Sequence, residues 1–307
     1  MKRPLVQMSY FPGCSLATSA KENNISLIKF CRKIGYELIE LEDWNCCGSS
    51  SAHSIDSKTA FGLASRNLSL ASADRPLLVA CPSCLLRLQQ THLHLTNDLN
   101  LRDEYEKMWE KPFSKDLKII HFFEMLADIN LPDFIEIQTE ASMKVQKQTT
   151  IDGQTPPAVK DAKQPLANIK FVPYYGCMLA RPPEMNRDRS YYGLIEKILS
   201  SLGAQRCRWS YGSMCCGTFL SAARPDIVTP IVNNIMQQAI DSGADCIVTA
   251  CAMCHMNLEI RCSIKNPIPT LHFSEILSLA MGIDGYEGWF ARHIIDPVPM
   301  LKAKEII

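Results

Sequence analysis

The stretch LLVACPSC occupies residues 77–84, and a similar stretch, CIVTACAMC, occupies residues 246–254. In both, an apolar run of the length of a β-strand leads directly into a Cys-x-x-Cys motif. This arrangement brings two thiols to the end of a strand and the start of a following helix. Because strand and motif occur twice in one chain, the sequence indicates an internal duplication.

The duplication extends to five cysteines in each half of the 307-residue chain. Successive cysteines are separated by 31, 0, 33 and 2 residues in the first half, and by 37, 0, 34 and 2 in the second. Flanking residues repeat as well, in the pairs YFPGC and YYGC, NCCG and MCCG, and HFFEML and HFSEIL. The two cysteine sets are Cys14, Cys46, Cys47, Cys81 and Cys84, and Cys177, Cys215, Cys216, Cys251 and Cys254.

Short apolar runs alternate with longer amphipathic segments throughout both halves. The runs LVQMSYF, PLLVA, IKFVPYY and CIVTA have the composition of buried strands, whereas NNISLIKFCRKIG and SYYGLIEKILSSLG have helical periodicity. This alternation predicts an α/β fold of two pseudo-symmetric Rossmann-like repeats with largely parallel sheets. In such sheets functional loops gather at the carboxyl ends of strands, which is where the cysteines fall.

The boundary between the halves is marked by a change in composition. Residues 138–168 lack apolar periodicity and are rich in Gln, Thr, Lys and Pro. Such segments form linkers or exposed excursions between packed units. We therefore predict a first domain over 1–137, a linker or exposed excursion over 138–168, and a second domain over 169–307.

Composition excludes several classes of function. Thirty-two basic residues balance thirty-two acidic ones, so no net charge attracts the chain to nucleic acid or to an anionic membrane. No apolar run has the length of a signal peptide core or of a membrane span. The sequence thus predicts a cytoplasmic protein with no integral membrane segment and no nucleic-acid partner.

Fourteen cysteines in a chain of this kind favour metal or redox chemistry over disulfides, because the cytosol keeps thiols reduced. Thiolates select iron-sulfur clusters, zinc or copper(I). A structural zinc site and a cubane cluster each need four ligands, so a set of five leaves one thiol for another purpose. Four cysteines stand outside the paired spacings, and we expect them to be structural: Cys31, Cys207, Cys246 and Cys262.

The motifs FPGCSLATSAKENN, LEDWNCCGSSSAHS, LLVACPSC, SMCCG and TACAMCH resemble the CCG-domain family, whose clearest match is the B subunit of heterodisulfide reductase (HdrB) and its soluble homologues. The resemblance covers nearly the whole chain and all ten motif cysteines. It implies that each set of five holds a noncubane [4Fe-4S] cluster, with one sulfur shared between irons. It also implies an oxidoreductase that reduces or forms disulfide or sulfur-carrier bonds at the two clusters.

The resemblance further implies two partner proteins. Electrons in that family come from an HdrC-like subunit with cubane [4Fe-4S] clusters, which is supplied by a flavin-bearing HdrA-like subunit. This chain has no C-x2-C-x2-C-x3-C-P run, so cubane clusters are expected on another polypeptide. Two other functions stay open: a quinone-linked CCG electron-transfer subunit of a dehydrogenase, and an assembly module with zinc in one or both cysteine sets.

Several residues near the motifs are weighed as secondary candidates. His53 and His255 are candidates to donate hydrogen bonds to cluster sulfur or to transfer a proton to substrate, although we favour a structural role. His121 and His272 occupy equivalent positions in the repeat, where we expect them to bond backbone groups. We expect packing around a cluster from Met178, Met214, Met253 and Met256, and a solvated face from Arg181, Arg187 and Arg189.

Overall fold

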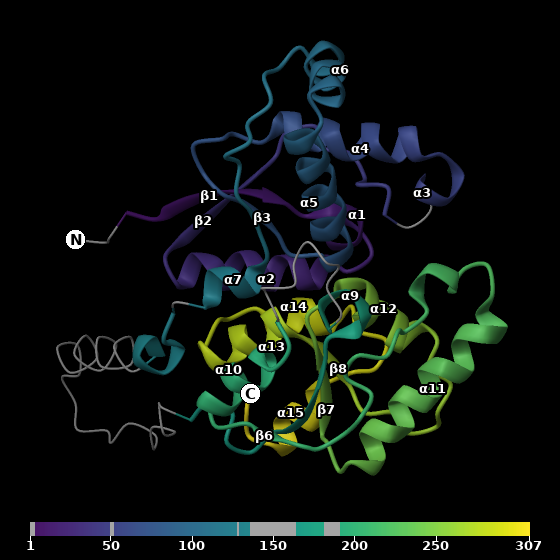
Figure 1. Cartoon of the computed structure of the whole chain (residues 1–307). Helices are drawn as coiled ribbons and strands as arrows, with labels where there is room; N and C mark the ends of the chain where they lie inside the picture. Colours follow the sequence, from purple (N-terminus) through teal and green to yellow (C-terminus); the bar gives the residue numbers. More distant parts are fainter. Residues whose placement is uncertain (1–3, 50–51, 128, 136–163, 181–190) are drawn as a thin grey trace.

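Figure 1 shows the computed structural model of the chain, which describes residues 4–49, 52–127, 129–135, 164–180 and 191–307. Within these residues the strands form two four-stranded sheets, in the orders β2-β1-β3-β4 and β6-β5-β7-β8. Every pairing in both sheets is parallel. The predicted α/β fold of two similar repeats is confirmed.

The first half alternates strands and helices from the first strand onward. Strand β3 and the last four residues of β1 are buried, as expected for the inner strands of a parallel sheet covered on both faces. In chain order the elements are β1 (Val6–Phe11), α1 (Gly13–Ala17), α2 (Lys21–Lys33), β2 (Tyr36–Glu40), α3 (Ala52–Ile55), α4 (Ser57–Leu70), β3 (Leu77–Val79), α5 (Pro82–Asn97), α6 (Leu99–Trp109), β4 (Ile119–Ile120) and α7 (Phe122–Leu126).

The second half repeats the order of strands, with a 3-10 helix in the place of α3 and one helix in the place of α5 and α6, and then adds helices at its end. Its inner strands β5 and β7 are buried like those of the first sheet. The elements are β5 (Lys170–Tyr174), α9 (Gly176–Ala180), α10 (Leu194–Ser201), β6 (Gln205–Arg206), the 3-10 helix η2 (Thr218–Leu220), α11 (Pro225–Asp241), β7 (Cys246–Thr249), α12 (Ala252–Ile260), β8 (Thr270–His272), α13 (Phe273–Ala280), α14 (Tyr286–Phe290) and α15 (Val298–Ala303).

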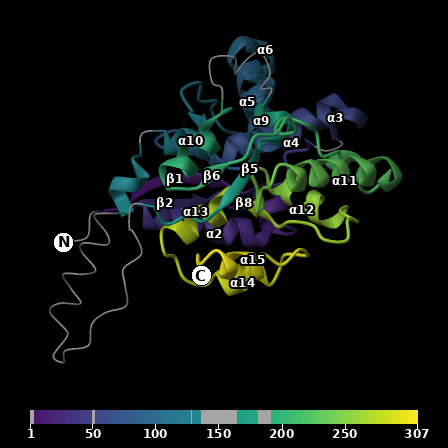
Figure 2. The ribbon, with the colours of Figure 1, turned by 90° about the horizontal axis from the view of Figure 1, so that it is seen from below.

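The two halves share one apolar core. Helices α2 and α13 pack side by side between the sheets, as both views show (Figures 1 and 2). The ring of Phe273 lies edge-on to that of Phe123, with centroids 4.9 Å apart, and a single buried apolar cluster includes residues of both halves. Hydrogen bonds cross the same contact, from Ser274 Oγ to the Asn23 carbonyl and from Ser278 Oγ to the Ser26 carbonyl. Burial and satisfied polar groups together fix the two halves relative to each other.

Strand order places the loops that carry the cysteines. In an order of this type the loops after the two central strands leave to opposite sides, which opens a crevice at the carboxyl edge of the sheet. The central strands are β1 and β3 in the first sheet, and β5 and β7 in the second. Most of the predicted linker lies in residues 136–163, outside the described part of the chain, so the proposed domain division stays a prediction.

Candidate functional site

The first cysteine set gathers at the carboxyl edge of the first sheet. Cys14 lies in α1 directly after β1, the adjacent pair lies in the loop after β2, and Cys81 precedes the first residue of α5. The Sγ atoms of Cys46 and Cys14 are 3.7 Å apart, and those of Cys47 and Cys84 are 3.1 Å apart. The loops therefore bring together thiols that are up to 70 positions apart in the sequence.

The second set repeats this arrangement. Cys177 lies in α9 after β5, and Cys251 precedes the first residue of α12, as Cys81 precedes that of α5. The Sγ atoms of Cys216 and Cys254 are 3.4 Å apart. Cys177 is hydrogen bonded to Cys215, and the charges of Cys215, Cys216 and Cys251 all act on its thiol. The structure thus places five thiols of each half in one group.

The first member of each adjacent pair is poised to be a thiolate. Hydrogen bonding with Cys14 lowers the pKa of Cys46, and hydrogen bonding with Cys177 lowers the pKa of Cys215 to about 6. A backbone N–H two residues further on donates to each sulfur, from Gly48 with N and Sγ 3.5 Å apart and from Gly217 with 3.4 Å. Because thiolates are the metal-binding form, the first sulfur of each pair is suited to bind a metal or cluster.

A glycine precedes the first cysteine of each set because the backbone passes close to a sulfur there. A Cβ placed on Gly13 would lie 2.9 Å from Cys84 Sγ, and one placed on Gly176 would lie 3.0 Å from Cys254 Sγ. Both glycines also have positive φ, +72° and +65°. Side chains are therefore excluded at these positions for conformational and for steric reasons.

Amide side chains hold the loops of the adjacent pairs. In the first half the Asn67 side chain accepts a hydrogen bond from the Asn45 N–H at 3.0 Å and donates to the Asn45 carbonyl at 2.9 Å. In the second half Asn257 Nδ2 donates to the Cys216 carbonyl at 2.7 Å. Asn67 and Asn257 are both buried, so the loops are anchored to helices α4 and α12.

The equivalent histidines fix the strand ends that precede the two Cys-x-x-Cys motifs. His121 Nε2 lies 3.2 Å from the Ala80 carbonyl, and its Nδ1 accepts from the Phe123 N–H. His272 caps α13 in the same way and bonds the Ala250 backbone. Burial lowers the pKa of His121 to about 4 and that of His272 to about 3, so both rings are neutral. The expectation that they bond backbone groups is confirmed.

The helices that carry cysteines of the two sets contact one another where the halves meet. Helix α5 of the first half packs against α9 of the second, and α1 packs against α12 (Figure 1). Met253 contacts the apolar clusters around both sets. A cavity of about 20 Å³ lies here, lined by Pro82, Ser83, Tyr175, Cys177, Met178, Cys215, Cys216, Thr218, Phe219, Cys251, Met253 and Cys254. The expected packing role of Met178 and Met253 agrees with this placement, whereas Met214 is exposed and does not fit that expectation.

Both ring nitrogens of His255 lie beside groups other than cysteine sulfur, so the ring is not placed to donate a hydrogen bond to a cluster. Its Nδ1 lies 3.0 Å from the amide of Asn23, and its Nε2 lies 3.4 Å from Glu259 Oε1. Sequence reasoning missed Glu259 and His293, which contact each other in the same buried cluster. The spacing of four residues between His255 and Glu259 on one helix was the available signal. The side chain of His53 and residues Arg181, Arg187 and Arg189 lie outside the described part of the structure.

The four cysteines outside the sets occupy ordinary packing positions. Cys31 and Cys246 are fully buried in the core shared by the two halves, and burial raises the pKa of both thiols. Cys207 and Cys262 are half-buried against the apolar cluster of the second half. None of the four approaches a cysteine set in the described hydrogen bonds, which agrees with the predicted structural role. Across the residues described, no helix is long and apolar enough to span a membrane.

Comparisons with known proteins agree with the two repeats. The family model of the cysteine-rich domain named CCG matches residues 8–89 and 171–259. The chain is 27% identical to the 8-methylmenaquinol:fumarate reductase membrane anchor subunit of Wolinella succinogenes, over 94% of this chain and 97% of that one. It is 23% identical to the B subunit of the ferredoxin/F420H2-dependent CoB-CoM heterodisulfide reductase of Methanosarcina acetivorans, over 97% and 96%.

A further relative and a solved structure extend these matches. A protein of Archaeoglobus profundus described as similar to the B subunit of heterodisulfide reductase is 26% identical, over 91% of this chain and 92% of that one. A crystal structure of a hypothetical protein from Helicobacter pylori superposes with a TM-score of 0.68 at 14% identity. This likeness covers 95% of the present chain and 52% of the other, and it supports the fold.

Proposed function

The chain belongs to the CCG cysteine-rich domain family, and on that premise we propose that it is the iron-sulfur subunit of a heterodisulfide reductase-like complex. In this proposal it reduces or forms disulfide or sulfur-carrier bonds at two noncubane [4Fe-4S] clusters. The ligands would be the ten cysteines of the two sets. Full-length similarity to proteins described as the B subunit of heterodisulfide reductase, or as similar to it, supports the assignment.

One observation carries the proposal: the five thiols of the second set line a cavity that also borders the first Cys-x-x-Cys motif. The cavity is lined by cysteines of the second set and by Pro82 and Ser83, which lie between the cysteines of the first Cys-x-x-Cys motif. The cavity has room for about one water molecule, so a substrate would bind at its mouth, beside the exposed Cys215. Cleavage of a disulfide to two thiols consumes two electrons and two protons, and two clusters, when bound, would each supply one electron.

The chain's own residues contribute position and exclusion of water. Cys47, Cys84, Cys216 and Cys254 are buried, whereas Cys14 and Cys215 are exposed at the edge. Burial strengthens the attraction between a thiolate and a bound metal ion, because the surroundings have a low dielectric constant. Met253 and Phe219 would close the remaining sides of the cavity with apolar surface. The exposed cysteines leave an approach for substrate.

The proposed partners follow from the similarity to proteins described as the B subunit of a heterodisulfide reductase, which is one subunit of a larger enzyme. In this proposal electrons reach the two cysteine sets from another subunit. We propose an HdrC-like subunit with cubane [4Fe-4S] clusters as that donor, and a flavin-bearing HdrA-like subunit in the larger complex. Co-purification from the native source under anaerobic conditions tests both.

Electron paramagnetic resonance of the anaerobically purified protein tests the reaction. After oxidation we expect a paramagnetic signal that appears only with a thiol substrate and that is absent with the matching alcohol. Substitution of Phe219, which lines the cavity and is 39% exposed, by Ala should change the thiol-dependent signal while iron content stays the same. Spectra that are identical with and without thiols would contradict the proposed reaction.

A second candidate is a quinone-linked electron-transfer subunit of a dehydrogenase. It is favoured by the 27% identity to the membrane anchor of 8-methylmenaquinol:fumarate reductase. A separate cavity of about 320 Å³ between α7 and α10 has the size and the mainly apolar walls that suit a small organic ring. Its walls include Phe123, Leu126, Leu194 and Ile198.

The two candidates place the substrate at different cavities: the thiol or disulfide beside the second cysteine set, and the quinone between α7 and α10. If the protein exchanges electrons with quinone, a quinol should reduce the oxidised protein. Ile198→Trp should then slow this reduction without changing the thiol-dependent paramagnetic signal. If the heterodisulfide reductase-like function holds, Ile198→Trp should leave the thiol response intact and quinol should be inert.

The third candidate, a zinc-stabilised assembly module, rests on the sulfur separations. Sγ atoms that lie 3.1 to 3.7 Å apart are near the edge of about 3.8 Å of a tetrahedron with Zn–S bonds of about 2.3 Å. A fifth thiol in each set exceeds what such a site uses. Metal analysis separates the candidates, because zinc without iron in the cysteine sets fits the assembly module and no other.

A further inference from the structure

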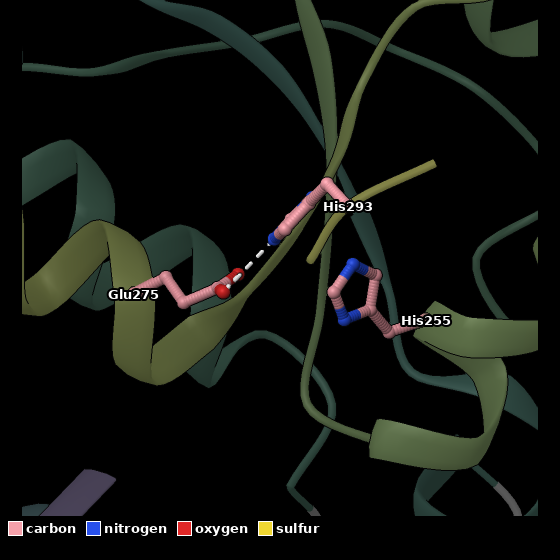
Figure 3. Close-up of side chains that lie close together, drawn as sticks. All are labelled: His255, Glu275 and His293. Carbon is pink, nitrogen blue, oxygen red and sulfur yellow. Dashed lines mark hydrogen bonds and ion pairs between the residues drawn. The ribbon is translucent and has the colours of Figure 1, made fainter. Parts of the chain in front are cut away.

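A second group of metal-ligating side chains lies beside the second cysteine set and belongs to none of the motifs. His255 comes from α12, Glu275 from α13, and His293 from the segment between α14 and α15. One ligand atom of each lies within 4.8 Å of the others. Figure 3 shows His255 and Glu275 on either side of His293, with the ion pair between Glu275 and His293 drawn as a dashed line. Glu259 of α12 completes the group.

Each of three side chains in this group has one atom engaged elsewhere and one atom left over. Glu259 Oε2 accepts the Ile294 N–H at 2.9 Å, His293 Nε2 bonds Glu275 Oε1 at 3.0 Å, and His255 Nδ1 bonds the Asn23 amide at 3.0 Å. The remaining atoms are Glu259 Oε1, His293 Nδ1 and His255 Nε2. Among the described residues these three buried atoms make no other polar contact and lie against one another, with Glu259 Oε1 paired to both histidines.

The two separations that involve Glu259 Oε1 are close to those between metal ligands. Glu259 Oε1 is 3.0 Å from His293 Nδ1 and 3.4 Å from His255 Nε2. A tetrahedral zinc site with bonds of about 2.0–2.1 Å has ligand atoms about 3.3 Å apart. In such sites the other nitrogen of each histidine is typically held by a carboxylate or another polar group, which is the role that Glu275 and Asn23 fill here.

Charge balance also favours a divalent cation. The side chains of Glu259, Glu275, His255 and His293 are at most 5% exposed. Glu259 and Glu275 bring two carboxylates into this buried group. Glu22, the neighbouring buried carboxylate, has its own ion-pair partner in Arg292 at 3.3 Å. Buried charge is costly unless it is paired, and a divalent cation bound to neutral histidines balances the two carboxylates.

We propose that His255 Nε2, Glu259 Oε1 and His293 Nδ1 bind a divalent first-row transition-metal cation, with zinc as the expected occupant. Two imidazoles and one carboxylate are a donor set that suits zinc or iron(II). The cation would tie α12, which carries Cys254 and directly follows Cys251, to the segment after α14. The first half has Leu85 and Gln89 at the positions equivalent to His255 and Glu259, so the site is confined to the second half.

Metal analysis combined with X-ray absorption on the intact, anaerobically purified chain tests the proposal. The protein is incubated with zinc alone and freed of loose metal by gel filtration. We expect about one zinc per chain with ligands at about 2.0–2.1 Å, which is distinct from the sulfur distance of about 2.3 Å of any zinc in the cysteine sets. Repeating the incubation with iron(II) alone identifies the preferred cation.

Metal content and affinity in variants of the proposed ligands and of their hydrogen-bond partners identify which side chains bind the cation. Glu259→Gln and His293→Gln should each lose the nitrogen- and oxygen-bound metal, and Glu275→Gln and Asn23→Ala should weaken binding about 10- to 100-fold. Glu124→Gln is the matched control, because Glu124 caps α7 as Glu275 caps α13, and it should leave the metal content unchanged. If the ligand variants do not fold, the metal affinities of Asn23→Ala and Glu124→Gln still test the site, because only Asn23→Ala should bind metal more weakly than the wild type.

Two results would overturn the proposal. One is a wild-type chain that takes up metal with sulfur ligands only, which would leave this group as a proton-bridged ion cluster. The other is a metal with nitrogen and oxygen ligands whose affinity is the same in wild type, Asn23→Ala and Glu275→Gln. An iron(II) ion with these ligands, lost in His293→Gln, would support the site with a different occupant.

Discussion

Substitution of Gly176 by Ala tests how closely the backbone of the second half approaches a sulfur. The Cβ of the new residue would lie 3.0 Å from Cys254 Sγ, whereas non-bonded heavy atoms pack best at about 3.5–4.0 Å. Cys254 is buried in the first turn of α12, so its sulfur has little room to retreat. We expect this overlap to cost about 1–3 kcal/mol.

The positive φ of Gly176 contributes a second penalty, which needs its own control. An alanine in the left-handed region costs roughly 1–2 kcal/mol, of which about 0.4–1 kcal/mol is offset by the reduced entropy of the unfolded chain. Gly282 has a similar φ of +59°, and nothing lies within 4 Å of a Cβ placed there. Gly282→Ala therefore carries the conformational penalty alone.

Urea unfolding of both variants, followed by circular dichroism, measures the difference. We expect Gly176→Ala to be less stable than Gly282→Ala by about 1–3 kcal/mol. After anaerobic reconstitution, Gly176→Ala should bind about half the iron of the wild type and Gly282→Ala the full amount. Equal stability and equal iron content in the two variants would refute the close approach of backbone and sulfur.

Three further predictions concern the ligands, the buried histidines and the shared core. Cys216→Ser should halve the iron content while Cys262→Ser, outside both sets, leaves it unchanged; elemental analysis decides, and equal content would contradict the ligand assignment. Burial lowers the pKa of His121 to about 4, below its value of about 6.5 in the unfolded chain. The neutral ring therefore contributes fully to stability above about pH 6.5, and the free energy of unfolding should fall by about 3 kcal/mol as the pH drops to about 4. Urea unfolding across this pH range should show a shallower dependence in His121→Asn; an unchanged slope would argue that the ring is not buried neutral. Phe273→Ala should cost about 3–5 kcal/mol because the ring is fully buried between the halves, whereas the exposed Leu99→Ala should change stability by less than about 0.5 kcal/mol; similar losses in both would contradict the shared core.

The sequence was sufficient for the fold class and for the grouping of cysteines, because both depend on local patterns. The apolar run before Cys81 and the one before Cys251 identify buried parallel strands, and the spacing of the motifs gives the same order of elements twice. Strand order follows less directly, since pairing of β1 with both β2 and β3 depends on long-range packing.

The contact between the halves was beyond the sequence patterns. Nothing in the periodicity of α2 predicts that Ser26 meets α13, or that Met253 lies between the two cysteine sets. The buried group of His255, Glu259 and His293 was missed for the same reason, because His293 joins it from a segment without regular structure. Residues that meet only through tertiary packing leave no signal in spacing.

The central claim is that each set of five cysteines holds an iron-sulfur cluster, and iron and acid-labile sulfide per chain test it most directly. The protein is purified and analysed under strict anaerobiosis, with X-ray absorption to assign any zinc by its ligands. We expect about eight irons and about eight sulfides per chain, with any zinc bound by nitrogen and oxygen alone. Zinc bound by sulfur at about 2.3 Å, with no iron, would contradict the claim.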